Sequence, residues 1–152
     1  MKFTFKKSER LNSKKVIERL FDKKGSEEIQ SVFHYPFRVS FEKVLSIKYQ
    51  VLSSELDNIT DEMELTTHNS QLTTNTLPQI LISVSKRSFK CAVDRNLVKR
   101  RIREAYRLNK HLLLQKPAHQ IPAYIAFVYI AKTIEDYTKI EKSMKMVFQK
   151  MT

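Results

Sequence analysis

The sequence predicts a single α+β domain with a four-stranded sheet and the element order αβββαβα. Apolar residues recur at helical spacing in three segments and form strand-like runs in four others. The chain has 152 residues, of which 41% are hydrophobic, enough for one core. It contains neither an apolar run of membrane-spanning length nor a signal-peptide pattern. We therefore expect one domain over residues 1–152, located in the cytoplasm and with no membrane partner.

The first helix is expected at residues 13–24, where four apolar residues recur at helical spacing: Val16, Ile17, Leu20 and Phe21. Ser13 is a favourable N-cap, and Gly25, the only glycine of the chain, stands where a left-handed C-cap would end the helix. Residues 32–45 follow, and their alternation has the period of a strand: Phe37, Val39 and Phe41 alternate with Arg38, Ser40 and Glu42.

Three more strands are expected at residues 80–86, 90–93 and 124–131. The last is apolar on both faces, which predicts a central place in the sheet. Cys91, the only cysteine, is interpreted as a small packing residue of the strand at 90–93. The closing helix, at residues 135–151, has an apolar stripe that should pack on the core: Tyr137, Ile140, Met144, Val147, Phe148 and Met151.

A polar and acidic segment separates the first strand from the second. No lysine or arginine occurs between Lys48 and Lys86, and the interval ends in the run TTHNSQLTTNTLP. Such a composition cannot bury much apolar surface. We expect residues 53–78 to be an insertion or a long mobile loop, whose carboxylates are solvated rather than bound to a metal ion.

The most informative segment is residues 86–110, KRSFKCAVDRNLVKRRIREAYRLNK. It holds ten lysines and arginines against two acids, a net charge of +8 within a chain of net charge +12. From Asn96 onward, a helix at about 100° per residue would sort the residues onto two faces. The inner arc would hold Val98, Ile102, Ala105 and Asn109, and the outer arc Asn96, Lys99, Arg100, Arg103, Arg107 and Lys110.

The outer face of this helix is unusual for a solvated surface. Ordinary exposed helices place glutamate and lysine four residues apart for mutual support, whereas this face places like charges a turn apart. Such repulsion destabilises the free protein unless a partner supplies negative charge. The face therefore predicts a polyanion as partner.

Catalysis by the protein's own side chains is not expected. Hydrolysis of RNA would need carboxylates that converge on a metal ion or a pair of histidines poised as acid and base. The four histidines lie in dissimilar segments, without an acid at useful spacing: His34, His68, His111 and His119. We predict no catalytic and no metal-binding residues. Charge alone leaves open a non-enzymatic ribosomal or nucleoid protein that binds RNA or DNA.

Two segments carry a family resemblance. LISVSKRSFKCAVDRNLVKRRIREAYR resembles the signature of the protein subunit of bacterial ribonuclease P, and FTFKKSERLNSKKVIERLF resembles the start of that family. The resemblance implies a small α/β sandwich of the ribosomal protein S5 domain 2-like fold, with a left-handed βαβ crossover around the basic helix. It also implies a role in an endonuclease that removes the 5′ leader of precursor tRNA, with the chemistry carried by the RNA subunit. Leu97 and Phe89 depart from the family pattern, which often has arginine and a glycine-containing turn there.

The resemblance also assigns roles to residues. The residues implied to face the catalytic RNA are Lys86, Arg87, Lys90, Arg95, Asn96, Lys99, Arg100, Arg103 and Arg107. The precursor's single-stranded leader would lie in a cleft between the first helix and the sheet, and the candidates there are Lys14, Lys15, Ile17, Phe21 and Phe37. For Phe21 and Phe37 a plain core role stays equally open. We also interpret three cations near the N-terminus, Lys6, Lys7 and Arg10, as facing RNA.

The expected partners are therefore the catalytic RNA of ribonuclease P and precursor tRNA. The sequence implies no protein partner. Mg²⁺ is expected in the active site of the RNA subunit, and no cofactor is expected on the protein's side chains.

Overall fold

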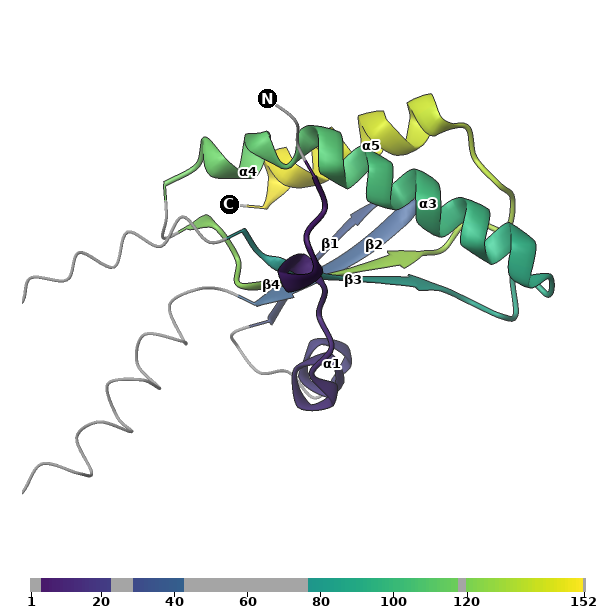
Figure 1. Cartoon of the computed structure of the whole chain (residues 1–152), viewed down its shortest axis with the longest axis horizontal. Helices are drawn as coiled ribbons and strands as arrows, with labels where there is room; N and C mark the ends of the chain where they lie inside the picture. Colours follow the sequence, from purple (N-terminus) through teal and green to yellow (C-terminus); the bar gives the residue numbers. More distant parts are fainter. Residues whose placement is uncertain (1–3, 23–28, 43–76, 118–119, 152) are drawn as a thin grey trace, which may run out of the picture.

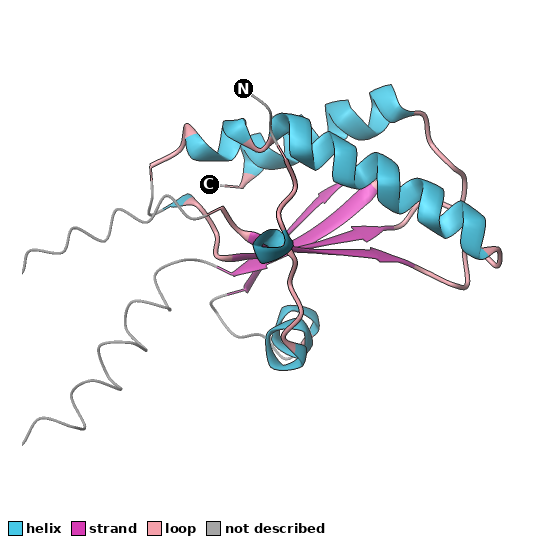
Figure 2. Cartoon of the chain, in the orientation of Figure 1, coloured by secondary structure: helices cyan, strands magenta, loops and turns pink. Residues whose placement is uncertain are grey.

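The structure is a computed structural model that describes residues 4–22, 29–42, 77–117 and 120–151. It has the α+β class that the sequence predicts, with one four-stranded sheet and helices on both of its faces (Figures 1 and 2). No helix in these ranges is long and apolar enough to cross a membrane. The elements in chain order are the short 3₁₀ helix η1 (Lys7–Glu9), α1 (Lys14–Phe21), β1 (Ile29–His34), β2 (Phe37–Glu42), β3 (Gln79–Val84), α3 (Ala92–Asn109), α4 (His111–Leu114), β4 (Tyr124–Tyr129) and α5 (Tyr137–Lys150).

The sheet has the strand order β1-β2-β4-β3. β1 pairs with β2, and β2 with β4, in antiparallel fashion, whereas β3 pairs with β4 in parallel. β4 is therefore a central strand, as its apolar residues on both faces predict. Because α3 connects the parallel neighbours β3 and β4, these elements form the βαβ unit that the family resemblance implies. The hand of the crossover stays a prediction.

The prediction of one strand at residues 32–45 is wrong. β1 and β2 form a hairpin in which His34 pairs with Phe37, so that Tyr35 and Pro36 make the turn. Proline has no N–H to donate to a ladder and favours turns, which is why the strand breaks there. Residues 43–45 lie outside the described residues.

The prediction of a strand at residues 90–93 is also wrong. Cys91 is the exposed N-cap of α3, which begins at Ala92. A short apolar run is ambiguous between strand and helix, and the Arg95 side chain resolves it locally. Its guanidinium donates to the carbonyl oxygens of Phe89 at 2.9 Å and Lys90 at 2.7 Å, which closes a turn before the helix. The two errors cancel, so the predicted order αβββαβα holds with different strands.

The first helix begins where predicted and ends early. Ser13 is its N-cap, but the helix stops at Phe21 with Asp22 as C-cap. Gly25 lies outside the described residues, as do residues 53–76 of the expected insertion. The closing helix and the central strand match their predicted positions within two residues.

Two apolar clusters hold the layers together. The larger lies between the sheet and the helices α3 and α5, where the rings of Tyr106, Phe127 and Phe148 meet edge-on at centroid distances of 6.3 to 6.4 Å. The predicted stripe of α5 is buried there: Ile140, Met144, Val147, Phe148 and Met151. The smaller cluster packs α1 on the opposite face of the sheet, around Ala126 of β4.

Candidate nucleic-acid interface

Helix α3 has the two faces that its sequence predicts. Val98, Ile102 and Ala105 are fully buried against the sheet and α5. Asn109 is also buried, and its side-chain amide donates to the carbonyl oxygen of Ala105 at 2.8 Å, which satisfies one of its polar atoms. The apolar arc of the predicted helix is thus confirmed.

The outer face of α3 carries the predicted cations at different depths. Asn96 and Arg100 are exposed, while Lys99, Arg103 and Arg107 are half-buried. None of the ion pairs formed within the described ranges includes Lys99, Arg100 or Arg103. These three are therefore the outer-face cations of α3 whose charge no carboxylate of the described residues offsets at close range.

Arg107 differs from its neighbours because Glu104 holds it. Its Nε donates to Glu104 Oε2 at 2.9 Å, and its second nitrogen donates to Oε1 at 2.6 Å. This forked contact lowers the pKa of Glu104 and raises the pKa of Arg107. A phosphate at this point would have to compete with the carboxylate.

Lys110 does not lie on the outer face, so its predicted place there is wrong. Its side chain is buried and forms an ion pair with Glu9, with Nζ 2.8 Å from Oε1. The partner is 101 positions away in the chain, so helical periodicity could not reveal it.

The turn before α3 brings more positive charge to the N-terminal end of the helix. Lys86, Arg87 and Lys90 are all exposed. Arg95 is half-buried because its guanidinium binds the carbonyl oxygens of this turn. Arg95 therefore positions the exposed cations beside the first turn of α3.

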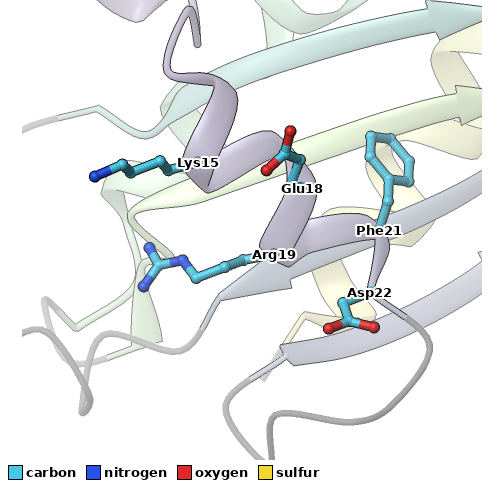
Figure 3. Close-up of a pocket in the computed structure, with 5 residues that line it drawn as sticks. All are labelled: Lys15, Glu18, Arg19, Phe21 and Asp22. Atoms are coloured by element: carbon cyan, nitrogen blue, oxygen red, sulfur yellow. The ribbon is translucent and has the colours of Figure 1, made fainter.

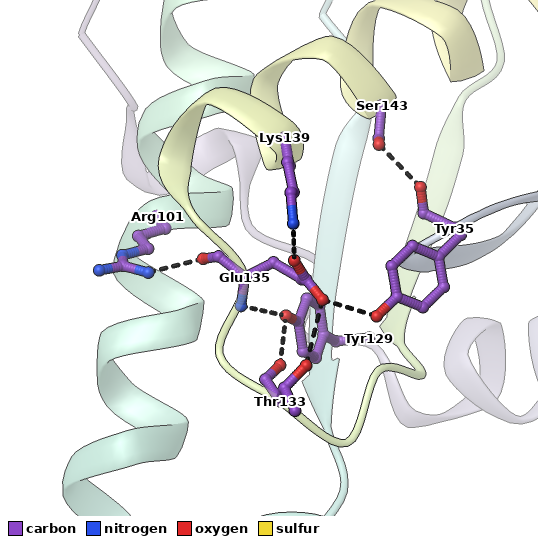
Figure 4. Close-up of polar contacts among 7 residues, drawn as sticks. All are labelled: Tyr35, Arg101, Tyr129, Thr133, Glu135, Lys139 and Ser143. Carbon is purple, nitrogen blue, oxygen red and sulfur yellow. Dashed lines mark hydrogen bonds and ion pairs between the residues drawn. The ribbon is translucent and has the colours of Figure 1, made fainter.

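A polar junction fixes the other side of α3 (Figure 4). Arg101 donates to the carbonyl oxygen of Glu135, in the connection between β4 and α5, at 2.6 Å. The Glu135 carboxylate accepts hydrogen bonds from Tyr35 at 2.6 Å and from Lys139 at 3.1 Å, and these contacts lower its pKa. The junction thus links α3, the β1–β2 turn and α5, which holds the basic helix in place on the sheet.

The predicted leader cleft corresponds to the face of the sheet that carries α1. Lys14 and Lys15 are exposed there, Ile17 is half-buried against the smaller cluster, and Phe21 is 43% exposed. Phe37 is wrongly assigned to the cleft. It is fully buried on the opposite face, since it shares its side of β2 with Val39 and Phe41 in the larger core.

Sequence reasoning missed two residues of this face. Phe33 of β1 is 65% exposed, the highest exposure of any aromatic side chain in the ranges described. It pairs directly with Arg38 of β2, which is also exposed. Arg38 could have been placed by its alternation with Phe37, whereas Phe33 could not, because the hairpin turn between them was not foreseen. Together they offer a ring and a cation side by side.

A shallow pocket of about 530 Å³ lies along α1 (Figure 3). It is lined by Lys15, Glu18, Arg19, Phe21 and Asp22. Arg19 is engaged with the buried Glu42 at 3.2 Å, and the lining has two carboxylates for two cations. This balance of charge does not favour binding of a phosphate. The feature of the pocket that suits an unpaired base is the exposed ring of Phe21.

Metal ligands do not gather in the parts of the chain that the structure describes. There, no group of three or more histidine, cysteine, aspartate or glutamate side chains is placed to hold an ion. The absence of protein-bound metal stays a prediction.

The model of the family described as Ribonuclease P matches residues 5–152. The chain belongs to the ribonuclease P family. Two strains of Porphyromonas gingivalis have a relative named ribonuclease P protein component, 49% identical over 69 residues, which are 43% of this chain and 49% of the relative. A protein of that name from Idiomarina loihiensis is 47% identical over 55 residues, 36% of this chain and 37% of the relative. The chain thus spans about half the length, or less, of these curated relatives.

Membership of the ribonuclease P family confirms the resemblance and disfavours a ribosomal or nucleoid protein. The two departures from the family pattern have different settings. Leu97 is partly exposed on α3, where it replaces an expected cation and lowers the charge of that face. Phe89 is buried and packs against Tyr129 at a ring-centroid distance of 6.0 Å, so the turn is held by a side chain where the family often has glycine.

Proposed function

We propose that this chain is the protein subunit of ribonuclease P, an endoribonuclease that removes the 5′ leader of precursor tRNA. The observation that carries the proposal is the family match over residues 5–152, together with an α3 whose inner face is apolar and whose outer face is basic. In this proposal the RNA subunit performs the cleavage, and the protein binds both that RNA and the substrate.

The proposed role of α3 is to bind phosphates of the catalytic RNA. Each protein cation that neutralises a phosphate releases a condensed counterion, so contacts of this kind sum over the whole face. Arginine suits a folded RNA backbone because its planar fork can hold two phosphate oxygens, while lysine adds charge without fixed geometry. The nine residues assigned from the sequence stay candidates, with Lys99, Arg100 and Arg103 the least engaged by protein carboxylates.

The proposed path of the leader is the face of the sheet beside α1. Phe33 and Phe21 present exposed rings there, and an unpaired base stacked on such a ring gains about 1–3 kcal/mol without its identity being read. Arg38, Lys14 and Lys15 supply positive charge on the same side of the molecule. Stacking of this kind suits leaders of varied sequence.

In this proposal catalytic Mg²⁺ acts only in the active site of the RNA subunit. Two polyanions, the catalytic RNA and the precursor, repel one another, and a protein of net charge +12 beside both would lower that repulsion. Because protein cations would take over part of the screening that Mg²⁺ otherwise provides, the complex would need less Mg²⁺ than the RNA alone requires. The proposal assigns no catalytic role to protein side chains.

Reconstitution tests this function. Nuclease-free protein alone should not cleave precursor tRNA in Mg²⁺, whereas its addition to the cognate RNA at near-physiological salt should accelerate cleavage of substrates that carry a leader. The double variant Lys99→Ala/Arg100→Ala is the matched control, because it keeps the fold and removes two charges from the outer face of α3. Cleavage by the protein without RNA, or equal stimulation by the variant, would contradict the proposal.

A further inference from the structure

Residues 4–11, here called the N-terminal strap, cross the β3 edge of the sheet between the layer of α3 and that of α1 (Figure 1). Leu11 N–H donates to the carbonyl oxygen of Ile80 at 3.0 Å, and Arg10 forms a parallel bridge with the same residue. Phe5 meets the ring of Tyr106 on α3 edge-on at 5.9 Å. The strap is thus docked on both β3 and α3.

A buried ion pair fastens the strap to the end of α3. Lys110 Nζ lies 2.8 Å from Glu9 Oε1 and 3.0 Å from Oε2, and it also donates to the carbonyl oxygen of Thr4 at 2.7 Å. Both side chains are at most 5% exposed. The backbone N–H of Lys6 donates to Glu9 Oε1 at 3.0 Å, so the carboxylate also shapes the strap itself.

The charges of the strap are sorted by depth. Its only acid, Glu9, points inward and is neutralised by Lys110. Its three cations, Lys6, Lys7 and Arg10, are all exposed. The surface that the strap presents therefore carries positive charge alone, beside a helix whose outer face is also positive.

The position of the strap beside α3 costs electrostatic free energy, and the buried ion pair opposes that cost. Cations placed next to the basic face of α3 repel it in the free protein, and each contact that fastens the strap acts against this repulsion. A buried ion pair is a poor source of net stability, because desolvation offsets much of its attraction, but removing one partner leaves an uncompensated buried charge. The Glu9–Lys110 pair therefore serves to hold the strap in one position rather than to add net stability.

We infer that the strap and α3 form one composite surface for RNA phosphates, in which the buried Glu9–Lys110 pair holds Lys6, Lys7 and Arg10 beside the helix. Glu9 and Lys110 are positioning residues, and the three exposed cations are the groups that touch RNA. The inference rests on the proposed function and extends it from the helix to the N-terminal strap.

The first arm of the test removes the exposed charges. The triple variant Lys6→Ala/Lys7→Ala/Arg10→Ala should melt at nearly the native temperature. The slope of log affinity against log salt concentration, measured with the cognate catalytic RNA, should fall in magnitude by about one for each phosphate that is no longer neutralised. An unchanged slope for the catalytic RNA, together with unchanged binding of leader-bearing precursor by the holoenzyme, would overturn the inference.

The second arm tests positioning with a mutant cycle. Glu9→Gln keeps the size of the side chain and an acceptor for Lys6 N–H, yet it removes the charge that holds Lys110. Although this variant is more positive than the native chain, it should bind RNA more weakly. In the triple-alanine background the same change should have little further effect on affinity, because the cations it positions are gone. Equal losses in both backgrounds, measured well below the melting temperature, would show a purely structural role and refute positioning.

The third arm identifies the source of the phosphates. Loss of affinity for the catalytic RNA alone assigns the strap to that RNA, whereas loss only for leader-bearing precursor on the assembled holoenzyme assigns it to the substrate. Arg100→Ala on α3 is the reference. If it weakens RNA binding and the strap variants do not, only this inference fails; if it too has no effect, the proposed function fails.

Discussion

Phe33 and Phe37 lie four positions apart in one hairpin and have opposite environments. Phe37 is fully buried against α3 and α5, while Phe33 is exposed on the face that carries α1. The turn at Tyr35 and Pro36 is responsible, because His34 pairs with Phe37 and Phe33 with Arg38, which places the two rings on opposite sides of the sheet.

This pair makes a matched test at the scale of single residues. Phe33→Ala should leave the melting temperature nearly unchanged, but it should weaken binding of leader-bearing precursor to the holoenzyme by about 1–3 kcal/mol, the range for one stacked base. Phe37→Ala should instead destabilise the fold by about 3–5 kcal/mol. Thermal melting and affinities for precursors with and without a leader distinguish the two. If Phe33→Ala affected leaderless tRNA equally, Phe33 would not be a leader contact.

Single residues were predictable where a local rule governs them. The inner face of α3 follows from helical periodicity, and each of its predicted members is buried. Lys110 was not predictable, because its burial depends on Glu9, which is 101 positions away. Phe33 was hidden for the same kind of reason, since its exposure depends on a turn whose position decides the register of two strands.

At the scale of elements, α3 has fewer free arginine side chains than its composition indicates. Arg107 is held by Glu104, Arg101 by the carbonyl oxygen of Glu135, and Arg95 by the turn before the helix. Arginine's several donors allow such contacts, so a count of arginines overstates the number of free guanidinium donors presented to RNA. Among the outer-face cations of α3, Lys99, Arg100 and Arg103 form no ion pair with a carboxylate of the described residues, and they lie in the middle of the helix.

The Glu104–Arg107 contact gives a prediction for the element. Glu104→Gln should release Arg107 and raise the magnitude of the salt slope for RNA binding by up to about one. Glu141→Gln is the control, because it makes the same change in net charge by breaking an ion pair with Lys145 on α5. If both variants raised the slope equally, net charge rather than the released arginine would be the cause.

The same contact makes stability depend on pH. Since the contact lowers the pKa of Glu104, the stability it adds is present above the ordinary pKa of glutamate and is lost as the pH falls through the lowered value.

Element types were predictable where a segment is long and periodic, as in α3 and α5, or continuously apolar, as in β4. The short segments were not. The alternation at 32–45 continued on both sides of a proline, and the run at 90–93 was too brief to separate a strand from the first turn of a helix. In both places a turn decided the structure, and the turn at Phe89 and Lys90 is closed by the side chain of Arg95, which lies beyond it.

At the scale of the whole molecule, the chain is divided by charge. Cations gather on α3, on the turn before it, on the N-terminal strap and on the helices α1 and α5, whereas residues 49–85 contain no lysine or arginine. A surface that binds polyanions gains from the absence of competing carboxylates, so an acidic segment of this kind is best kept away from it. Most of this segment lies in the connection between β2 and β3.

The two ends of the connection between β2 and β3 lie at the same end of the sheet. Glu42, the last residue of β2, and Gln79, the first of β3, both pair with Tyr124, one on each side of β4. Two strand spacings of about 4.8 Å separate them, roughly 10 Å, a distance that a few residues can span. The connection between β2 and β3 therefore has no geometric need for its full length.

Replacing residues 55–76 with six glycine and serine residues should leave the fold and the affinity for catalytic RNA nearly unchanged. The replacement roughly halves the connection between Glu42 and Gln79, and halving a loop changes its closure free energy by only about 0.6 kcal/mol. A second variant that keeps the length but permutes the sequence of 55–76 is the control for composition. Melting temperature and RNA affinity should agree among the native chain and both variants. If the short linker alone lowered the RNA affinity by more than a few-fold, or the melting temperature by several degrees, the length of the segment would matter. If both variants did so, the native sequence of the segment would be a packed or binding element, and the domain would need more of its chain than the sheet and helices account for.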